Sequence, residues 1–271
     1  MPELPEVETI VRDLRDKIAG QTITSVDLIR PSIWRSGPPR KKSLINTVIN
    51  AVIRKGKNIL IPLSNNFTLI FHLKMTGRLT VESKDAPIPK HTHLIFNFGD
   101  RQLRFNDVRR FGYADLAPSD KLAEIEYLKK IGPDPFELSR AMFIDLIRSK
   151  NRMIKPLLMD QSIIAGIGNI YSDEALFLAG IHPRRISSRI KIDKLEKLYN
   201  STLRVLQNSI KSRGTSVSDY VDASGQKGTF QNSLRVYGRE GEPCKKCRRK
   251  IKRETIGSRS AHFCPGCQRL N

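Results

Sequence analysis

The sequence has little acid and no long apolar run, and each shortage excludes a class of protein. Among 271 residues, 27 Asp and Glu face 48 Lys and Arg, which leaves a formal net charge of +21. No apolar run approaches the roughly 20 residues of a membrane-spanning helix. The acidic start Met1–Glu6 lacks the basic and apolar regions of a secretory signal. We therefore expect a cytoplasmic protein without a membrane partner, whose excess positive charge meets a polyanion, most simply nucleic acid.

Cysteine is absent from the first 243 residues, and its four copies then fall close together. They form two pairs, each with two intervening residues, separated by sixteen residues: Cys244, Cys247, Cys264 and Cys267. This spacing is typical of a tetrahedral zinc site, and two disulfides are the alternative. Because a cytosolic chain is kept reduced, we predict one Zn²⁺. Four thiolates leave no open coordination position, so the zinc is expected to be structural.

The segment that holds these cysteines is strongly basic. From Cys244 to Asn271 it contains nine Lys or Arg residues and a single acid, Glu254. Arg259 lies in Gly257–Ser260, which reads as the tip of a β-hairpin. A zinc-stapled hairpin covered with cations is suited to binding DNA phosphates.

The rest of the chain predicts folded domains, because 39% of the residues are hydrophobic and 28% are charged. Apolar spacing predicts a helix over 5–19, and β-rich runs over 67–73, 94–98 and 103–105 predict a β-sandwich. Gly132–Pro135 breaks the chain, and the pattern beyond it is helical. The expected fold class is α+β and multidomain. The expected domains and helices are 1–131 (β-sandwich with one N-terminal helix), 136–235 (helical, with helices at 142–147, 154–159, 170–179 and 192–210) and 236–271 (zinc-finger β-hairpin).

Two glycine-containing segments of the helical region are open to more than one interpretation. Residues 163–169 form either a double turn that cradles a phosphate before the next helix or a plain helical turn. Residues 212–230 are rich in Gly, Ser, Asp and Thr, and are either a functional loop or disordered.

The N-terminus offers a nucleophile. Removal of Met1 before the small Pro2 exposes a secondary amine whose reference pKa, roughly 7.7–8.0, lies well below that of lysine. Such an amine attacks an electrophilic carbon to form an iminium, and the adjacent Glu3 is placed for acid–base work. With Met1 attached, the Pro2 nitrogen is an unreactive amide. By itself, Met-Pro-Glu also reads as an ordinary chain start.

Five features together resemble one family, the bacterial formamidopyrimidine-DNA glycosylases. They occur in order as Pro2–Thr9, Asp107–Gly112, Gly166–Tyr171, Gly180–Pro183 and the four-cysteine segment. The resemblance implies a bifunctional DNA glycosylase and abasic-site lyase that excises oxidised purines such as 8-oxoguanine and then cuts the strand. It implies double-stranded DNA with oxidised bases or abasic sites as partner, and a monomer. The alternatives are an endonuclease-VIII-like enzyme for oxidised pyrimidines and a non-catalytic zinc-finger protein that binds damaged DNA.

Carried onto this sequence, the resemblance implies a role for each matching residue. Pro2 is the nucleophile, and Glu3 protonates the sugar ring oxygen. Lys57 contacts the phosphate and the damaged nucleotide, although an ordinary turn lysine is the alternative, and Arg259 binds phosphate and acts in elimination. Met75, Arg109 and Phe111 fill the space of the extruded base, although core packing is an alternative for Met75 and Phe111. The remaining implied DNA contacts are His72, His91, Arg110, Asn151, Arg152, Lys155 and Asn169.

Three further implications concern the helical domain and the active-site surroundings. The resemblance implies a helix–two-turn–helix motif over 154–169, and a loop at 217–230 that closes over the flipped purine. Glu6 and Glu174 match acidic positions that support the active site. Asn151 departs from the basic residue that many relatives carry there, which puts that phosphate contact in doubt.

Overall fold

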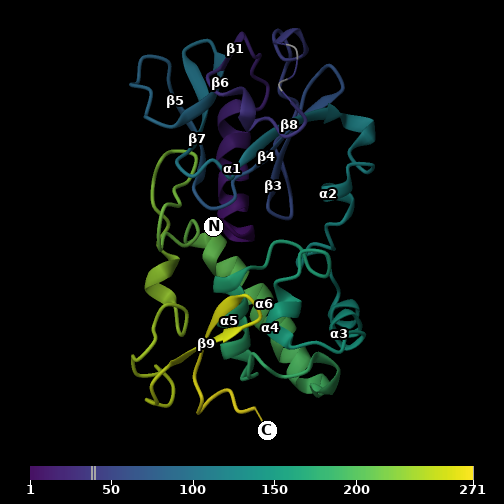
Figure 1. Ribbon diagram of the computed structural model, residues 1–271, viewed down its shortest axis with the longest axis vertical. Helices are drawn as coiled ribbons and strands as arrows, with labels where there is room; N and C mark the ends of the chain where they lie inside the picture. The colour runs from purple at the N-terminus through teal and green to yellow at the C-terminus, as the bar shows by residue number, and fades with distance from the viewer. Residues whose placement is uncertain (38, 40, 271) are drawn as a thin grey trace. The chain divides into compact units, whose positions relative to one another are not determined.

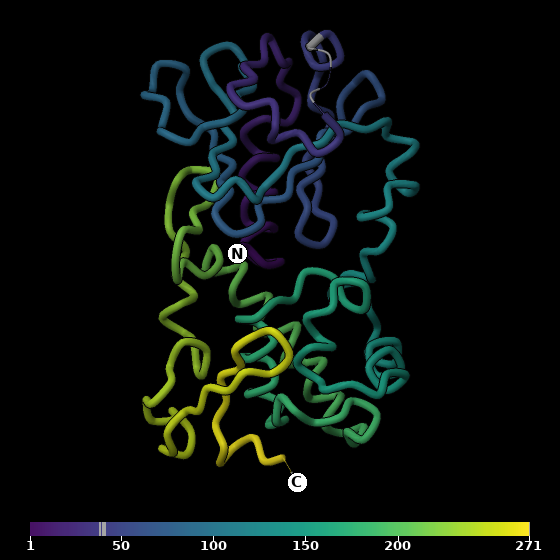
Figure 2. Tube along the Cα trace, viewed as in Figure 1, coloured from purple at the N-terminus to yellow at the C-terminus, as the bar shows by residue number. Residues whose placement is uncertain are grey.

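The computed structural model describes residues 1–37, 39 and 41–270. The described chain divides into two compact units. Unit 1 is Met1–Lys129 with Ser212–Thr229, and unit 2 is Lys130–Lys211 with Phe230–Asn271. Figure 2 follows the chain, which passes from one unit to the other three times.

Unit 1 is a β-sandwich with an N-terminal helix, labelled in Figure 1. In the described residues its strands form two four-stranded antiparallel sheets, ordered β1-β6-β7-β5 and β2-β3-β4-β8. The elements are α1 (Leu4–Ile18), β1 (Ser25–Leu28), β2 (Ile53–Lys55), β3 (Asn58–Pro62), β4 (Phe67–His72), β5 (Gly77–Ser83), β6 (Thr92–Phe98), β7 (Arg101–Asp107), β8 (Tyr113–Pro118) and α2 (Glu126–Lys129).

The core of unit 1 joins α1 to both sheets. Phe71 of β4 packs edge-on against Phe96 and Phe105 of the other sheet, with ring centroids 6.1 and 5.7 Å apart. The apolar stripe of α1 is buried in the same cluster. Its members, Val7, Ile10, Val11, Leu14 and Ile18, are each at most 1% exposed. Burial of this stripe fixes the direction of α1 and therefore the place of the residues that precede it.

Unit 2 is helical and carries the finger hairpin. Its elements are α3 (Arg140–Arg148), α4 (Ile154–Leu158), α5 (Asn169–Ala179), α6 (Ile192–Lys211), β9 (Lys252–Ile256) and β10 (Arg259–Phe263). α5 packs on α6 and on β10. A small apolar cluster of Phe177, Val236, Ile251, Cys244 and Cys264 joins α5 to the finger. Short 3-10 helices occur at Pro31–Ile33, Lys41–Ser43, Ser119–Lys121, Ser187–Arg189 and Phe230–Ser233.

The predicted fold class is confirmed, and the predicted helices and strands occur within a few residues of their expected bounds. The compact units differ from the predicted domain boundaries in two respects. Residues 212–229, assigned from sequence to the helical domain, pack with unit 1, and the finger shares unit 2 with the helices. Asn271, the predicted end of the finger, lies outside the described residues. Within the described part of the chain, no helix combines the length and apolarity needed to cross a membrane.

Candidate active site and nucleic-acid interface

Pro2 and Glu3 are held where the first helix begins. Pro2 is buried, and Glu3 is the N-cap of α1 with only 3% of its surface exposed. Glu3 and Glu6 form a reciprocal capping box, in which the Glu3 backbone N–H donates to Glu6 Oε2 at 2.8 Å. The two residues predicted to carry the chemistry are therefore fixed by the helix end rather than lying in a loose terminus.

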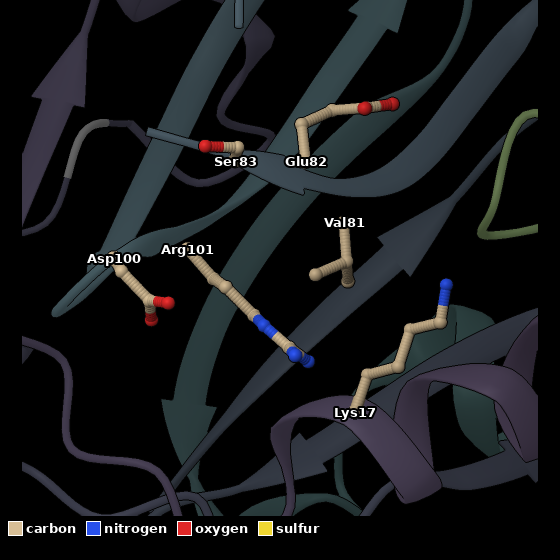
Figure 3. A pocket seen from close by; sticks show the side chains of 6 residues that line it. All are labelled: Lys17, Val81, Glu82, Ser83, Asp100 and Arg101. Carbon is tan, nitrogen blue, oxygen red and sulfur yellow. The ribbon is translucent and has the colours of Figure 1, made fainter. Parts of the chain in front are cut away.

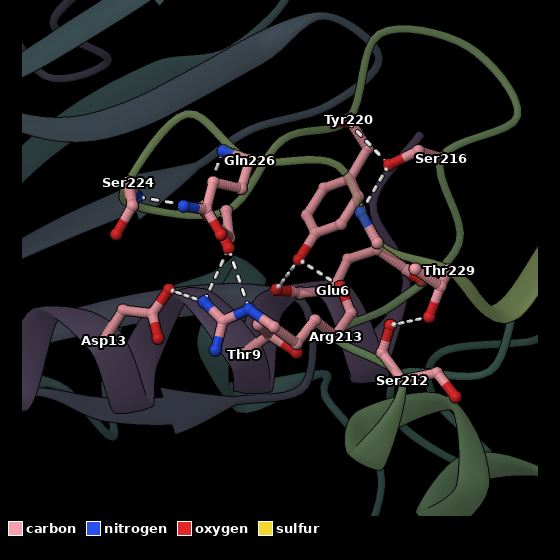
Figure 4. A network of polar contacts seen from close by, with 12 residues as sticks. Glu6, Thr9, Asp13, Ser212, Arg213, Ser216, Tyr220, Ser224, Gln226 and Thr229 are labelled. Carbon is pink, nitrogen blue, oxygen red and sulfur yellow. Dashed lines mark hydrogen bonds and ion pairs between the residues drawn. The ribbon is translucent and has the colours of Figure 1, made fainter.

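The second carboxylate oxygen of Glu6 ties this helix end to the segment 212–229 of unit 1. Glu6 Oε1 accepts a hydrogen bond from the Thr215 backbone N–H at 2.8 Å. The Tyr220 hydroxyl of the predicted lesion loop lies 3.4 Å from the Glu6 carbonyl and donates to the Arg213 carbonyl at 3.1 Å (Figure 4). Gly214 has a φ of +85°, and a Cβ there would lie 3.0 Å from Glu6 Oε1. Glu6, predicted only as a supporting residue, thus connects the Pro2–Glu3 end to the predicted lesion loop.

Most of the predicted lesion loop is anchored. Arg213 forms an ion pair with Asp13 of α1 at 2.6 Å (Figure 4). It forms a second ion pair with the buried Asp222 at 2.5 Å. Asp222 also accepts hydrogen bonds from the backbone N–H groups of Ser224 and Gln226, both at 2.9 Å. Exposed residues are confined to two short stretches, 217–219 and 224–227, with Thr229 beyond them. Sequence reasoning missed Arg213 and Asp222, because residues nine positions apart in a loop carry no periodic signal.

Lys57 and His72 lie close together at one end of the sheet β2-β3-β4-β8. Lys57 is in the β2–β3 turn and is 7% exposed, and the adjacent Asn58 pairs with His72. Burial, together with the charges of Lys74, Lys57 and Arg35, lowers the pKa of His72 to about 3. His72 Nδ1 accepts the Lys74 backbone N–H at 3.0 Å, so the proton of the neutral ring is on Nε2. His72 is therefore suited to contact a phosphate as a neutral donor.

The lowered pKa of His72 predicts a loss of stability in acid. The folded state resists protonation, so the contribution is complete above pH 6.5, the ordinary pKa, and is lost as the pH falls toward 3. Between pH 7 and pH 4 the wild-type chain is expected to lose about 3 kcal/mol through this group, and His72→Asn is expected to lose none of it. Urea unfolding at both pH values measures the difference. Equal pH dependence in the two proteins would contradict this assignment.

Met75, Arg109 and Phe111 form an exposed cluster. Met75 is 42% and Phe111 54% exposed, so the alternative that they are core residues is excluded. Arg109 Nη1 lies 3.2 Å from Met75 Sδ, and the guanidinium carbon lies 4.8 Å from the Phe111 ring centroid. Such a cluster of a thioether, a cation and a ring can enter a gap in a base stack.

A buried carboxylate that sequence reasoning missed shapes the loop after β7. Asp107 is fully buried and accepts hydrogen bonds from the Gly112 N–H at 2.7 Å, the Arg109 N–H at 3.2 Å and the Thr76 hydroxyl. Within this loop Arg110 is exposed and has a φ of +60°. The half-buried His91, which directly precedes β6, has a φ of +71°. Two predicted phosphate contacts therefore lie in left-handed backbone, which is uncommon for residues other than glycine and is found often at ligand sites.

Three predicted contacts of unit 2 precede or begin α4, and they differ in accessibility. Asn151 is exposed and accepts a hydrogen bond from the Ser188 hydroxyl at 2.9 Å. Arg152 is also exposed and pairs with Asp160 at 2.8 Å. Lys155, in contrast, is 0% exposed. This corrects the expectation that Lys155 faces DNA, because its ammonium group is enclosed by protein.

The helix–two-turn–helix motif is present between α4 and α5, and Gln161 organises its turns. Gln161 Oε1 accepts the Gly166 N–H at 2.9 Å, and its Nε2 donates to the carbonyls of Met159 and Ile167. Asn169 follows as the first residue of α5, and its Oδ1 is buried without a hydrogen-bond partner among the described residues. The N-terminal end of α5 at Asn169 carries the positive end of the helix dipole, which suits an anion.

Glu174 holds the chain that leads into the finger. Its carboxylate accepts the backbone N–H groups of Arg235, Val236 and Tyr237 at 2.9–3.0 Å. Burial raises the pKa of this carboxyl, and those three N–H donors oppose the rise. Glu174 therefore supports unit 2 structurally, which the sequence could not distinguish from a role in the active site.

The four cysteines fit a zinc ion. Their sulfur atoms all lie within 4.8 Å of one another, with 3.9 Å between Cys244 and Cys267 and 3.3 Å between Cys247 and Cys264. Zn–S bonds of about 2.3 Å in a tetrahedron place sulfur atoms about 3.8 Å apart. All four are free thiols rather than disulfides. The chain therefore has one structural zinc site, which holds the finger and supplies no reaction step.

Arg259 opens β10 directly after the hairpin turn at Gly257 and Ser258, close to the predicted tip. It is exposed, and its Nη1 makes one long contact of 3.5 Å with the Ser258 carbonyl.

A hollow of about 330 Å³ in unit 1 is lined by Lys17, Val81, Glu82, Ser83, Asp100 and Arg101 (Figure 3). Its two cations face two carboxylates, so it lacks the positive excess that a DNA site requires.

Three family models match successive parts of the chain. The formamidopyrimidine-DNA glycosylase N-terminal domain matches residues 1–114, and the formamidopyrimidine-DNA glycosylase H2TH domain matches 131–221. A zinc finger found in FPG and IleRS matches 241–270. Curated relatives named formamidopyrimidine-DNA glycosylase are 42% identical over nearly all of both chains. Those of Desulforamulus reducens and Pelotomaculum thermopropionicum align over 99% and 100% of this chain, respectively, and over the same shares of the relatives.

Solved structures agree with this assignment. A Lactococcus lactis FPG mutant in complex with Fapy-dG-containing DNA is 38% identical, with a TM-score of 0.93 over 99% of this chain and 100% of that one. MutM in complex with DNA containing carbocyclic 8-oxo-G is 39% identical, with a TM-score of 0.92 over the same shares. The chain therefore belongs to the formamidopyrimidine-DNA glycosylase family.

Proposed function

We propose that this protein removes oxidised purines from duplex DNA in base-excision repair and then cleaves the strand at the resulting abasic site. Relatives that align with this chain over nearly their full length are named for this activity. Similar solved structures contain DNA with Fapy-dG, carbocyclic 8-oxo-G or an abasic site. These ligands favour oxidised purines over oxidised pyrimidines. Because the substrate is chromosomal, we place the enzyme in the bacterial cytoplasm, and we expect it to act as a monomer.

The observation that carries the mechanism is the fixed position of Pro2 and Glu3 at the start of α1. After removal of Met1, the Pro2 amine attacks the deoxyribose carbon that bears the damaged base, while Glu3 protonates the ring oxygen. The bond from C1′ to the base breaks, and the departing base takes up the proton that the Pro2 nitrogen loses. The C1′–O4′ bond then opens as the protonated ring oxygen becomes the 4′ hydroxyl, which leaves an iminium between Pro2 and the opened sugar. The iminium acidifies the neighbouring carbon, so β- and then δ-elimination release both phosphates.

The other site residues receive roles in filling the gap, binding phosphate and contacting the damaged nucleotide. Met75, Arg109 and Phe111 are exposed and fill the gap left by the flipped nucleotide. Arg259 supplies a cation to the phosphate at the lesion, and Lys57 contacts the damaged nucleotide. Phosphate contacts on the two units are proposed for His72, His91, Arg110, Asn151, Arg152 and Asn169.

A comparison of two lesions tests this function. Processed protein is expected to excise 8-oxoguanine at least about tenfold faster than thymine glycol, measured as kcat/KM on duplex oligonucleotides. Glu3→Gln is expected to slow base excision by about 10²- to 10⁴-fold, the usual worth of a general acid, while it still cleaves a preformed abasic site. Glu8→Gln, which changes a carboxylate of the same helix outside the capping box, serves as the matched control.

Each other outcome identifies an alternative. Thymine glycol as the better substrate would assign the protein to oxidised pyrimidines. Binding of both lesions without excision of either by chains that start at Pro2 would make it a non-catalytic damage-binding protein.

A further inference from the structure

A fully buried ion pair lies beneath the finger hairpin. Lys155 Nζ of α4 and Asp173 Oδ1 of α5 are 2.6 Å apart, and both side chains are 0% exposed. Burying two charges costs several kcal/mol per ion, and a well-packed apolar pair would often be at least as stable. The role of the pair therefore lies in the further hydrogen bonds that its two side chains make, rather than in the stability of the ion pair itself.

Both members of the pair bind the backbone of β10. Lys155 Nζ donates to the Ser260 carbonyl at 2.6 Å, and Asp173 Oδ2 accepts the His262 backbone N–H at 2.9 Å. Asp173 Oδ2 also lies 3.3 Å from His262 Nδ1. A third contact comes from Asn169, whose side-chain nitrogen lies 3.4 Å from the Ser260 hydroxyl. The helices thus grip β10 at Ser260 and His262.

The gripped residues adjoin Arg259. The Arg259 side chain is exposed, and within the described residues its one hydrogen bond goes to its neighbour's carbonyl at 3.5 Å, so its direction depends on the backbone that bears it. The other strand, β9, has a weaker tie of this kind, an ion pair of 2.9 Å between Glu254 and Arg184 whose side chains are 37% and 40% exposed. Exposed pairs of this sort contribute little. The buried contacts to β10 therefore fix the backbone that bears Arg259, in addition to the cysteine site that holds the finger.

We propose that Lys155 and Asp173 are positioning residues that hold Arg259 in the place where it meets the DNA phosphate at the lesion. The proposal rests on the proposed function, because it assumes that Arg259 contacts phosphate. It also gives Lys155 a different role from direct DNA contact, since the ammonium group reaches the Ser260 carbonyl and not the surface.

The test uses the double variant Lys155→Met/Asp173→Asn. It removes one positive and one negative charge, so the net charge is unchanged and no lone buried charge remains to unfold the protein. The Ser260 tether is lost, while the amide that replaces the Asp173 carboxylate still offers an oxygen to the His262 backbone N–H. Arg259→Ala is the reference, and Glu254→Gln is the matched control on β9.

Two readouts separate positioning from a general structural role. The slope of log Kd against log salt on abasic-site duplex is expected to fall by about 0.9 in Arg259→Ala, the value of one phosphate contact. The charge-neutral double variant is expected to show the same fall. δ-Elimination is expected to slow about tenfold or more in both, the factor for one lost charge-assisted hydrogen bond, with β-product accumulating. Zinc content is expected to stay at one per chain.

Combination with Arg259→Ala decides the mechanism. If Lys155 and Asp173 act through Arg259, adding their substitutions to Arg259→Ala changes neither readout further. A further fall in slope in that background would show that Lys155 meets phosphate itself and would overturn the proposal, as would wild-type slope and elimination in the double variant. If Arg259→Ala itself behaves as wild type, the role proposed for Arg259 fails, and the positioning role fails with it. Excision of 8-oxoguanine by the unchanged protein tests the function separately.

Discussion

Protein that retains Met1 is expected to form no borohydride-stable adduct with abasic-site DNA, whereas protein that begins at Pro2 is expected to form it readily. In the retained form the Pro2 nitrogen is a tertiary amide, and its lone pair is delocalised into the carbonyl. The loss of strand cleavage should be about 10³-fold or more, as for other enzymes deprived of their nucleophile. Intact mass gives the N-terminus of each preparation, and gel electrophoresis after borohydride gives the adduct.

Binding separates this prediction from a loss of folding. Met1 is 48% exposed, so its retention leaves the core of unit 1 intact. The Kd for abasic-site duplex is therefore expected to change only a few-fold. Pro5→Ala, which replaces a second proline at the start of the same helix, is the matched control and should be trapped like wild type. A full yield of adduct from the Met1-retaining chain would place the nucleophile on another residue.

Removal of zinc is expected to weaken binding to lesion-containing duplex by about 100-fold or more. The free energy with which zinc folds such a finger is about 10–16 kcal/mol, far more than the small apolar cluster around Cys244 and Cys264 provides. Without zinc, the turn between β9 and β10 is no longer fixed. A 100-fold loss corresponds to about 2.7 kcal/mol, which is two or three phosphate contacts from this basic segment.

Reconstitution provides the control for zinc removal. Protein treated with a chelator is expected to regain affinity with one equivalent of Zn²⁺ and not with Mg²⁺, because four thiolates suit a soft metal. Cys264→Ser should resist rescue. Circular dichroism should show that the β-sandwich persists, since no cysteine lies in unit 1. Unchanged affinity in zinc-free protein would exclude the finger from DNA binding.

The elements that sequence predicted well are those whose pattern is local. The stripe of α1 repeats at helical spacing, and the structure buries each of its residues. The spacing of the four cysteines predicts a zinc site, and their sulfur atoms lie within 4.8 Å of one another in the structure. For Met75 and Phe111 the sequence leaves core packing and exposure both open, because an apolar residue in a loop gives no sign of which way it faces.

Other features depend on residues that meet only after folding. Lys155 reads as one more cation beside the DNA-binding turns, yet Asp173 and β10 enclose it. The segment 212–229 follows α6 in the chain, yet Arg213 anchors it to Asp13, 200 residues earlier. A charge count treats every lysine and arginine alike, whereas the structure divides them between exposed groups and internal ties.

The sequence by itself determined the family, the zinc ligands, and the helical and β regions, and it supplied the proposal of a nucleophile and an acid at positions 2 and 3. Each of these can be recognised from neighbouring residues or from fixed spacings along the chain. Only the tertiary structure decided that Glu6 joins the start of α1 to the segment 212–229, that Lys155 is internal, and that β10 is held from both α4 and α5. The physical reason is burial, because a charge removed from water must find its partner wherever the fold places one.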